Sequence, residues 1–168
     1  MSKLYLITGP AGVGKSTVSK RIAESLEKSV LLEGDEVYHH VVGGYVSPWK
    51  EKNHLDIFWK VCIDTIKNYL NAGYDVVFNY IIMPKDLKVL QNHFKDFETK
   101  FVVLLVDEKT ILKRDKERRE DCQMGDRCLV LLQNFKDENF KENHILDTTK
   151  LSVEETVNEI INKERFSI

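Results

Sequence analysis

The sequence predicts a single α/β domain built as a five-stranded parallel sheet with helices on both faces. Three observations support this fold class. Short apolar runs alternate with segments of helical periodicity from one end of the chain to the other. The apolar runs are continuous rather than alternating, as expected of strands that are covered on both faces. The length of 168 residues suits one domain with a sizeable core.

The expected strands are short, and polar residues follow most of them. The strands cover residues 3–8, 29–33, 75–79, 101–106 and 144–147. Because strands joined through helices run parallel, their carboxyl ends meet at one edge of the sheet, where such folds place their sites. Besides the loop after the first strand, the residues at that edge are Asp35, Asn79, Asp107 and Asp147.

The expected helices carry apolar stripes at helical spacing. They cover residues 15–28, 53–72, 108–121 and 127–139, and two more begin at Pro84 and after Ser152. Gly73 sits where a C-terminal cap belongs. Ser152 and Glu155 form the pattern of a capping box. The one irregular region of any length covers about residues 39–52.

A glycine-rich stretch joins the first strand to the first helix and fits the pattern G-x-x-x-x-G-K-[ST]. It consists of Gly9, Pro10, Ala11, Gly12, Val13, Gly14, Lys15 and Ser16, followed by Thr17. Glycines let the backbone approach a polyphosphate, whose charge is attracted by successive N–H groups and by the helix N-terminus. Lys15 is placed to reach the β- and γ-phosphates, and the Ser16 hydroxyl to ligate Mg²⁺. A ligand-free turn needs neither residue, so we expect residues 9–17 to bind Mg²⁺ and ATP.

Two carboxylates, Glu33 and Asp35, flank Gly34 at the end of the second strand. One of them can support Mg²⁺ through water, and the other can accept a proton from an attacking hydroxyl. We assign Glu33 to the metal and Asp35 to catalysis, although the sequence also allows the reverse assignment. The alternative to both is a turn with two solvated acids.

Basic residues crowd the helix expected at 108–121. They are Lys113, Arg114, Lys116, Arg118 and Arg119, and Arg127 follows after Gly125. Phosphoryl transfer needs cations that meet the charge of the γ-phosphoryl group, so we expect a lid at about 114–127. Arg114, Arg118 and Arg127 are its unranked candidate cations. The alternative is a solvated helix, in which interleaved acids pair with these bases at i,i+4.

The composition narrows the class of protein. The formal net charge is −2, so there is no overall basic field for nucleic acid. Three cysteines without a CxxC pattern favour neither a disulfide framework nor a zinc site, and they predict a reducing, cytoplasmic location. No apolar run approaches the length of a membrane span. A GTPase switch is not supported, because the chain has neither D-x-x-G nor N-K-x-D.

The chain resembles the P-loop small-molecule kinases, and it is most similar to the gluconate kinase family. The resemblance rests on GPAGVGKST, on LEGDEVYH after the second strand, on SPW, on LLVDEKTILKRDKERR, and on HILDTT before the last helix. It implies a nucleotide-kinase-like fold, with Asp35 near the substrate hydroxyl and with Asp147 and Thr148 near the adenine. It also implies a substrate-binding insert at about 36–52 and the lid at about 114–127.

The resemblance predicts an ATP-dependent kinase that phosphorylates a hydroxyl of a small metabolite, with gluconate or a similar sugar acid or polyol as the acceptor. The insert at 39–45 and the segment RREDCQMGDR depart from that family, and chloramphenicol phosphotransferases and shikimate kinases share the architecture. No arginine occurs between Arg21 and Arg114, so a phosphate-bearing acceptor is disfavoured. A P-loop regulator that acts on a macromolecule remains open, and a polynucleotide kinase is less favoured. We expect a monomer or a homodimer.

Overall fold

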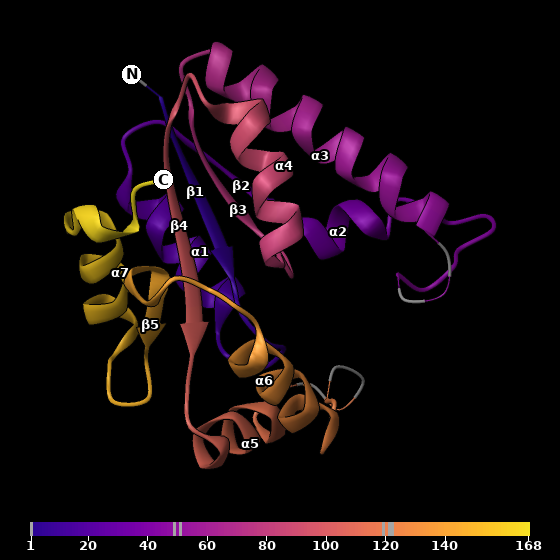
Figure 1. Cartoon of the computed structure of the whole chain (residues 1–168), viewed down its shortest axis with the longest axis vertical. Helices are drawn as coiled ribbons and strands as arrows, with labels where there is room; N and C mark the ends of the chain where they lie inside the picture. Colours follow the sequence, from indigo (N-terminus) through magenta and orange to yellow (C-terminus); the bar gives the residue numbers. More distant parts are fainter. Residues whose placement is uncertain (1, 49, 51, 119, 121–122) are drawn as a thin grey trace.

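A parallel sheet forms the centre of the molecule (Figure 1). The computed structural model describes residues 2–48, 50, 52–118, 120 and 123–168. The strands are β1 (Lys3–Thr8), β2 (Ser29–Glu33), β3 (Asp75–Asn79), β4 (Glu98–Leu105) and β5 (Ile145–Asp147). All neighbouring strands pair in parallel, in the order β2-β3-β1-β4-β5. The predicted five-stranded parallel sheet is therefore confirmed.

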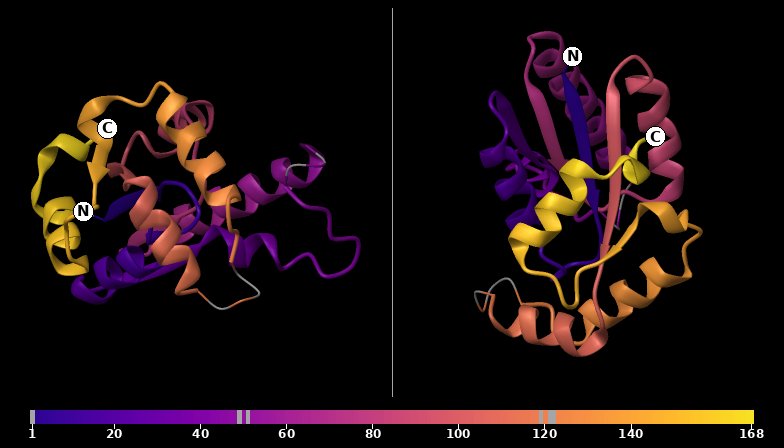
Figure 2. Two further views of the ribbon diagram at one scale, coloured as in Figure 1. Left: turned by 90° about the horizontal axis from the view of Figure 1, so that it is seen from below. Right: turned by 90° about the vertical axis from the view of Figure 1, so that its left-hand side faces the viewer.

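Helices cover both faces of this sheet, as the two further views in Figure 2 make clear. One face carries α3 (Lys52–Asn71) and α4 (Pro84–Phe94), and the other carries α1 (Lys15–Ser25) and α7 (Val153–Asn162). Beyond the carboxyl ends of the strands lie α5 (Glu108–Lys116) and α6 (Arg127–Asp137). Shorter segments are α2 (Gly34–Tyr38), η2 (Glu142–His144) and η3 (Glu164–Phe166). None of the helices in the described ranges is long and apolar enough to cross a membrane.

The core has two halves because side chains of a strand alternate between the faces of the sheet. In β1, Leu4 and Leu6 belong to the half under α3 and α4, whereas Tyr5 and Ile7 belong to the half under α1 and α7. All four are at most 2% exposed. Burial of such side chains contributes about 1.5–3 kcal/mol each, so β1 anchors both helical layers at once.

The connections around β1 determine where a ligand can enter. The chain leaves β1 through α1 for β2 at one edge of the sheet, returns to β3, and reaches β4 on the opposite side of β1 through α4. The connections therefore diverge at the carboxyl end of β1, which is the position where open parallel sheets hold their ligands. The glycine-rich loop begins at this point.

Some element ends differ from the prediction for local reasons. The first helix ends at Ser25 rather than at residue 28, because the hydroxyls of Ser25 and Ser29 donate to carbonyls of its last turn. The fourth strand begins at Glu98 rather than at residue 101, where Glu98 forms an ion pair with Lys3. The single helical turn α2 was not predicted, and His144 belongs to η2 rather than to the last strand.

A buried lysine fastens the last helix to the sheet. Lys100 in β4 is 2% exposed, and its ammonium donates hydrogen bonds to the carbonyls of Ile160, Ile161 and Lys163 at 3.2, 2.6 and 3.2 Å. These carbonyls end α7 and lack partners within the helix, and the helix dipole favours a cation there. Burial nevertheless lowers the pKa of Lys100, so the three bonds offset a desolvation cost.

We predict that Lys100→Met destabilises the protein by about 2 kcal/mol, because it leaves the terminal carbonyls of α7 without their charged donor. Urea unfolding followed by circular dichroism measures the change. Lys88→Met is the matched control, since Lys88 is exposed on α4. Equal midpoints for the two variants would show that the buried ammonium contributes nothing to stability.

Candidate functional site

A cleft of about 390 Å³ opens at the carboxyl edge of the sheet, where the sequence places the glycine-rich loop. Its floor is formed by residues 11–17 of the loop and the start of α1. The walls come from α2, from the end of α5 and the residues just after it, and from the segment that joins β5 to the first turn of α7. These walls contribute Asp35, Arg114, Glu117, Arg118, Thr148, Leu151, Val153 and Thr156.

The glycines of the loop are required by space as well as by backbone angle. Gly9 has φ 144°, and a Cβ atom at this position would lie 2.4 Å from the carbonyl oxygen of Leu104 in β4. Gly14 has φ 104° and forms the N-cap of α1. Side chains rarely adopt such angles, so glycine allows the loop to lie against β4 and turn its backbone into the cleft.

Lys15 is folded back onto the loop that carries it. Its Nζ atom donates to the carbonyl oxygens of Gly9 at 2.9 Å and Pro10 at 3.1 Å. The pKa of Lys15 is lowered to about 8, mainly because the ammonium is buried; the nearby Asp35 carboxylate opposes this shift, and the positive charge of Arg118 adds to it. Two charged groups from different walls of the cleft, Asp35 from α2 and Arg118 from the chain after α5, therefore act on this ammonium. An ammonium with so little hydration gains strongly from a phosphate.

The residues expected to hold Mg²⁺ are placed differently from one another. Ser16 and Thr17 are exposed in the first turn of α1 and line the cleft, so the Ser16 hydroxyl fits the expected ligand. Glu33 does not line the cleft, and its carboxylate accepts a hydrogen bond from the buried Asn79 amide at 3.3 Å. Within the described part of the chain, no three His, Cys, Asp or Glu side chains are grouped to hold a metal.

Asp35 opens into the cleft from the first turn of α2. Its position depends on Gly34, which packs against the buried ring of Tyr80. A Cβ atom at Gly34 would lie 2.5 Å from that ring, which rests on Phe58 with ring centroids 4.5 Å apart. The missing side chain therefore lets α2 start directly on an immobile aromatic surface. This contact places the start of α2, and with it Asp35, at the cleft.

The three candidate lid arginines have three different environments. Arg114 donates from Nη1 to the carbonyl oxygen of Val13 at 2.7 Å and from Nη2 to that of Thr148 at 3.3 Å, so it joins two walls of the cleft. Arg118 lines the cleft beside Lys15. Arg127 is exposed at the first residue of α6 and is not among the residues that line the cleft. Arg119 lies outside the described residues.

Asp147 and Thr148, the two residues expected near the adenine, differ in their environments. Thr148 is buried and lines the cleft, whereas the carboxylate of the exposed Asp147 accepts the backbone N–H of Thr149 and shapes the turn. Sequence reasoning missed Leu151, Val153 and Thr156, which add an apolar surface there. The available signal was the capping box of α7, because apolar residues flank its Ser152 on both sides.

The start of the predicted insert is tied to α2 by aromatic contacts. The Tyr38 hydroxyl donates to the carbonyl oxygen of Val46 at 2.7 Å, and the His39 and Tyr45 rings stack with centroids 5.7 Å apart. Tyr45 keeps 44% of its surface exposed, and its ring packs edge-on against the buried Tyr38 ring with centroids 5.8 Å apart. Trp49, which falls within the predicted insert, lies outside the described residues.

Comparison with known proteins identifies the class. Residues 4–137 match the family AAA_33, described as an AAA domain, and the chain belongs to this family. Together with the parallel sheet and the glycine-rich loop, this match establishes the fold of the P-loop kinases. A search of curated proteins finds no match.

Solved structures show how widely the fold is used. The tunicamycin resistance protein of Deinococcus radiodurans has a TM-score of 0.69 at 19% identity over 95% of this chain and 94% of its own. A gluconokinase from Sinorhizobium meliloti 1021 scores 0.68 at 17% over 94% and 89%. The Mycobacterium tuberculosis APS kinase in complex with AMPPNP and APS scores 0.70 at 14% over 96% of each chain. At these identities the likeness establishes the fold.

We predict that Lys15 loses its proton near pH 8, because burial disfavours the ammonium. The unfolded chain then binds more protons above that pH, so the contribution of Lys15 to stability rises from about pH 8 to the ordinary lysine pKa near 10.4. The Cε signal of ¹³C-labelled lysine, assigned with Lys15→Arg, reports the midpoint. Inorganic triphosphate should move that midpoint upward, and a midpoint near 10 in the free protein contradicts the prediction.

Proposed function

We propose that this protein is an ATP-dependent kinase that transfers the γ-phosphoryl group to a hydroxyl of a small metabolite. The observation that carries the proposal is the position of Asp35. Its carboxylate opens into the same cleft as the phosphate loop and acts on the charge of Lys15. A simple nucleotide-binding site needs the loop and the lysine, whereas a kinase also needs a group that receives the proton of the acceptor.

The loop side of the cleft suits the triphosphate. The backbone N–H groups of residues 11–15 and the N-terminus of α1 supply fixed positive potential. Lys15 replaces its bonds to the loop carbonyls by bonds to phosphate oxygens. The Ser16 hydroxyl would hold Mg²⁺, which would supply positive charge against the triphosphate. Leu151 and Val153 offer the apolar surface that an adenine ring requires.

The chemistry proceeds by one exchange of bonds at phosphorus. The acceptor oxygen forms a bond to the γ-phosphorus while the bond from that phosphorus to the bridging β,γ-oxygen breaks, and ADP leaves. The hydroxyl proton passes to the Asp35 carboxylate and then to solvent. Because the transition state is loose, Asp35 contributes by orienting the hydroxyl as much as by accepting its proton. Arg118 meets the charge on the γ-phosphoryl oxygens.

The acceptor side lacks the groups that hold a phosphate or a second nucleotide. No arginine occurs between residues 22 and 113. Among the described residues that line the cleft, the lysine and arginine side chains are Lys15 of the loop, Arg114 of α5 and Arg118 just after α5. An acceptor rich in hydroxyl groups and poor in charge fits best, so polyols and sugar acids such as gluconate lead the candidates. The similar tunicamycin resistance protein and APS kinase add tunicamycin and APS to the compounds worth testing.

We expect ATP consumption to rise well above its basal rate with one member of a panel of acceptors. The panel contains gluconate, other sugar acids, polyols, shikimate, chloramphenicol, tunicamycin and APS. Lys15→Ala should abolish transfer while the circular dichroism spectrum stays unchanged, because the loop loses its charge and not its fold. Undiminished turnover in Lys15→Ala contradicts the proposed site, and a 5′-hydroxyl oligonucleotide as the only active acceptor replaces the small metabolite by a nucleic acid.

A second prediction concerns the proton acceptor. Asp35→Asn should lower kcat by about 10²–10⁴-fold while binding of AMPPNP stays near that of the wild type, because an amide orients a hydroxyl but does not take its proton. Glu36→Gln is the matched control, since the neighbouring Glu36 is exposed on α2 and does not line the cleft. Glu33→Gln should be milder than Asp35→Asn. If Glu33→Gln is inactive while Asp35→Asn remains active, Glu33 is the proton acceptor and Asp35 supports the metal.

A further inference from the structure

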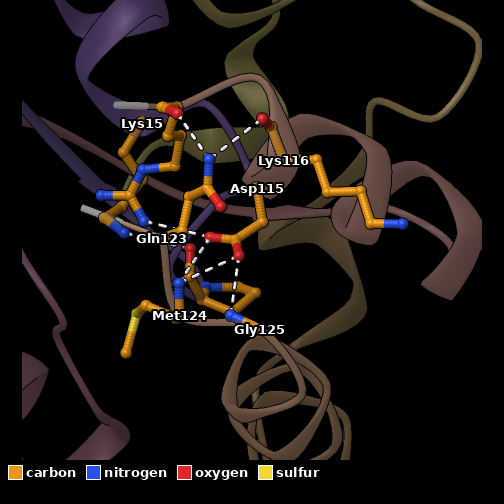
Figure 3. Close-up of polar contacts among 8 residues, drawn as sticks. Lys15, Asp115, Lys116, Gln123, Met124 and Gly125 are labelled. Atoms are coloured by element: carbon orange, nitrogen blue, oxygen red, sulfur yellow. Dashed lines mark hydrogen bonds and ion pairs between the residues drawn. The ribbon is translucent and has the colours of Figure 1, made fainter. Parts of the chain in front are cut away.

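One buried carboxylate near the cleft has no part in the proposed chemistry. Asp115 in α5 is 2% exposed, and a buried charge is costly unless hydrogen bonds satisfy it. Met124 N–H donates to its two oxygens at 3.2 and 2.9 Å, and Gly125 N–H donates to Oδ2 at 2.8 Å. Burial raises the pKa of Asp115, but these amides and the Arg118 guanidinium together hold it below the ordinary value. The carboxylate is therefore ionised. Figure 3 shows the Met124 and Gly125 amides that surround it.

These bonds reverse the direction of the chain after α5. The segment expected to continue the helix to residue 121 instead leaves it at Lys116, and the chain returns so that Met124 and Gly125 reach Asp115. The Gln123 amide closes the same turn, because it donates to the carbonyl oxygens of Lys116 at 3.2 Å and Arg118 at 2.9 Å. The terminal carbonyls of α5 thereby gain partners that a helix end lacks.

The same carboxylate holds Arg118. Arg118 donates from Nη1 to Oδ1 of Asp115 at 3.3 Å, and its side chain is 37% exposed where it lines the cleft. Within the described residues its Nη2 and Nε have no acceptor. A guanidinium held at one nitrogen keeps its remaining donors in a fixed plane. Because Arg118 also lowers the pKa of Lys15, its charge acts on the part of the cleft meant for the β- and γ-phosphates.

We propose that Asp115 is a positioning residue, which aims Arg118 at the transferring phosphoryl group by holding the Arg118 guanidinium and the returning chain at one point. The proposal rests on the kinase function proposed above. Asp115 touches neither nucleotide nor acceptor and acts through Arg118. It makes the orientation of Arg118 a property of the free protein, so the cation need not be ordered when the nucleotide binds.

The test compares two ligands that differ in the transferring group. AMPPNP resembles bound ATP, whereas ADP with aluminium fluoride imitates the planar phosphoryl group of the transition state. Asp115→Asn should weaken binding of ADP–aluminium fluoride by about 10²-fold, because a misaimed cation no longer meets the planar group, and should leave AMPPNP within about threefold. Arg118→Ala should show the same split. Asp137→Asn is the control, because Asp137 accepts one bond from Gln133 on the exposed side of α6.

The double variant decides whether Asp115 acts through Arg118. In the Arg118→Ala background, Asp115→Asn should cause no further loss of affinity for ADP–aluminium fluoride, because the effects of coupled residues are not additive. An equal loss in both backgrounds overturns the proposal. Should Asp115→Asn fail to fold, Arg118→Ala alone remains decisive: it must lose affinity for the planar ligand and keep the hydrogen-exchange protection of the Met124 and Gly125 amides. Retained affinity overturns the proposal.

Failure of the kinase function gives a different result. In that case the wild-type protein binds ADP with aluminium fluoride no more tightly than ADP alone. Asp115→Asn and Arg118→Ala then have no extra affinity for the planar ligand to lose. Such a result overturns the role of Asp115 in positioning for transfer together with the kinase function. Hydrogen exchange of the Met124 and Gly125 amides in Asp115→Asn still shows whether the carboxylate holds the returning chain.

Discussion

The close approach of Gly9 to the Leu104 carbonyl is the constraint on which the cleft depends. β1 and β4 are paired neighbours in the sheet. Gly9, the first residue after β1, therefore passes the last residues of β4 so closely that no side chain fits between them. The loop then has room to turn toward the cleft and to present N–H groups at the start of α1. Lys15, Arg114 and Thr148 are all placed relative to that loop, so the missing side chain at Gly9 influences the floor and two walls of the cleft.

The elements that local pattern could predict were those whose ends are set by neighbours in sequence. β2 and β3 begin and end where their apolar runs do, and the capping box places the start of α7. The end of α5 could not be predicted from periodicity, because Asp115 takes its bonds from amides nine and ten residues further on. Charged residues throughout that stretch look like a continuing helix. The sheet order and the start of β4 likewise depend on partners distant in the chain.

For the site, the glycine-rich loop was predictable because its pattern is dictated by phosphate chemistry, and Asp35 because strand ends converge on one edge. The sequence did not separate the roles of Arg114 and Arg118, since both are arginines in the charged helix predicted at 108–121. Their roles divide only in three dimensions, where one meets backbone carbonyls and the other a carboxylate. Asp147 shows the converse: its position after β5 is as expected, yet its carboxylate serves the turn.

The two ends of the chain emerge together at the edge of the sheet remote from the cleft. Lys3 opposes Glu98 at the start of β4, and the backbone N–H of Ile168 donates to the carbonyl oxygen of Thr99 at 3.0 Å. A fluorophore, a fusion partner or a surface tether attached near either end therefore lies at the edge of the sheet opposite the cleft. Immobilised protein presents its open cleft to the solution, which suits surface-based screening for the acceptor.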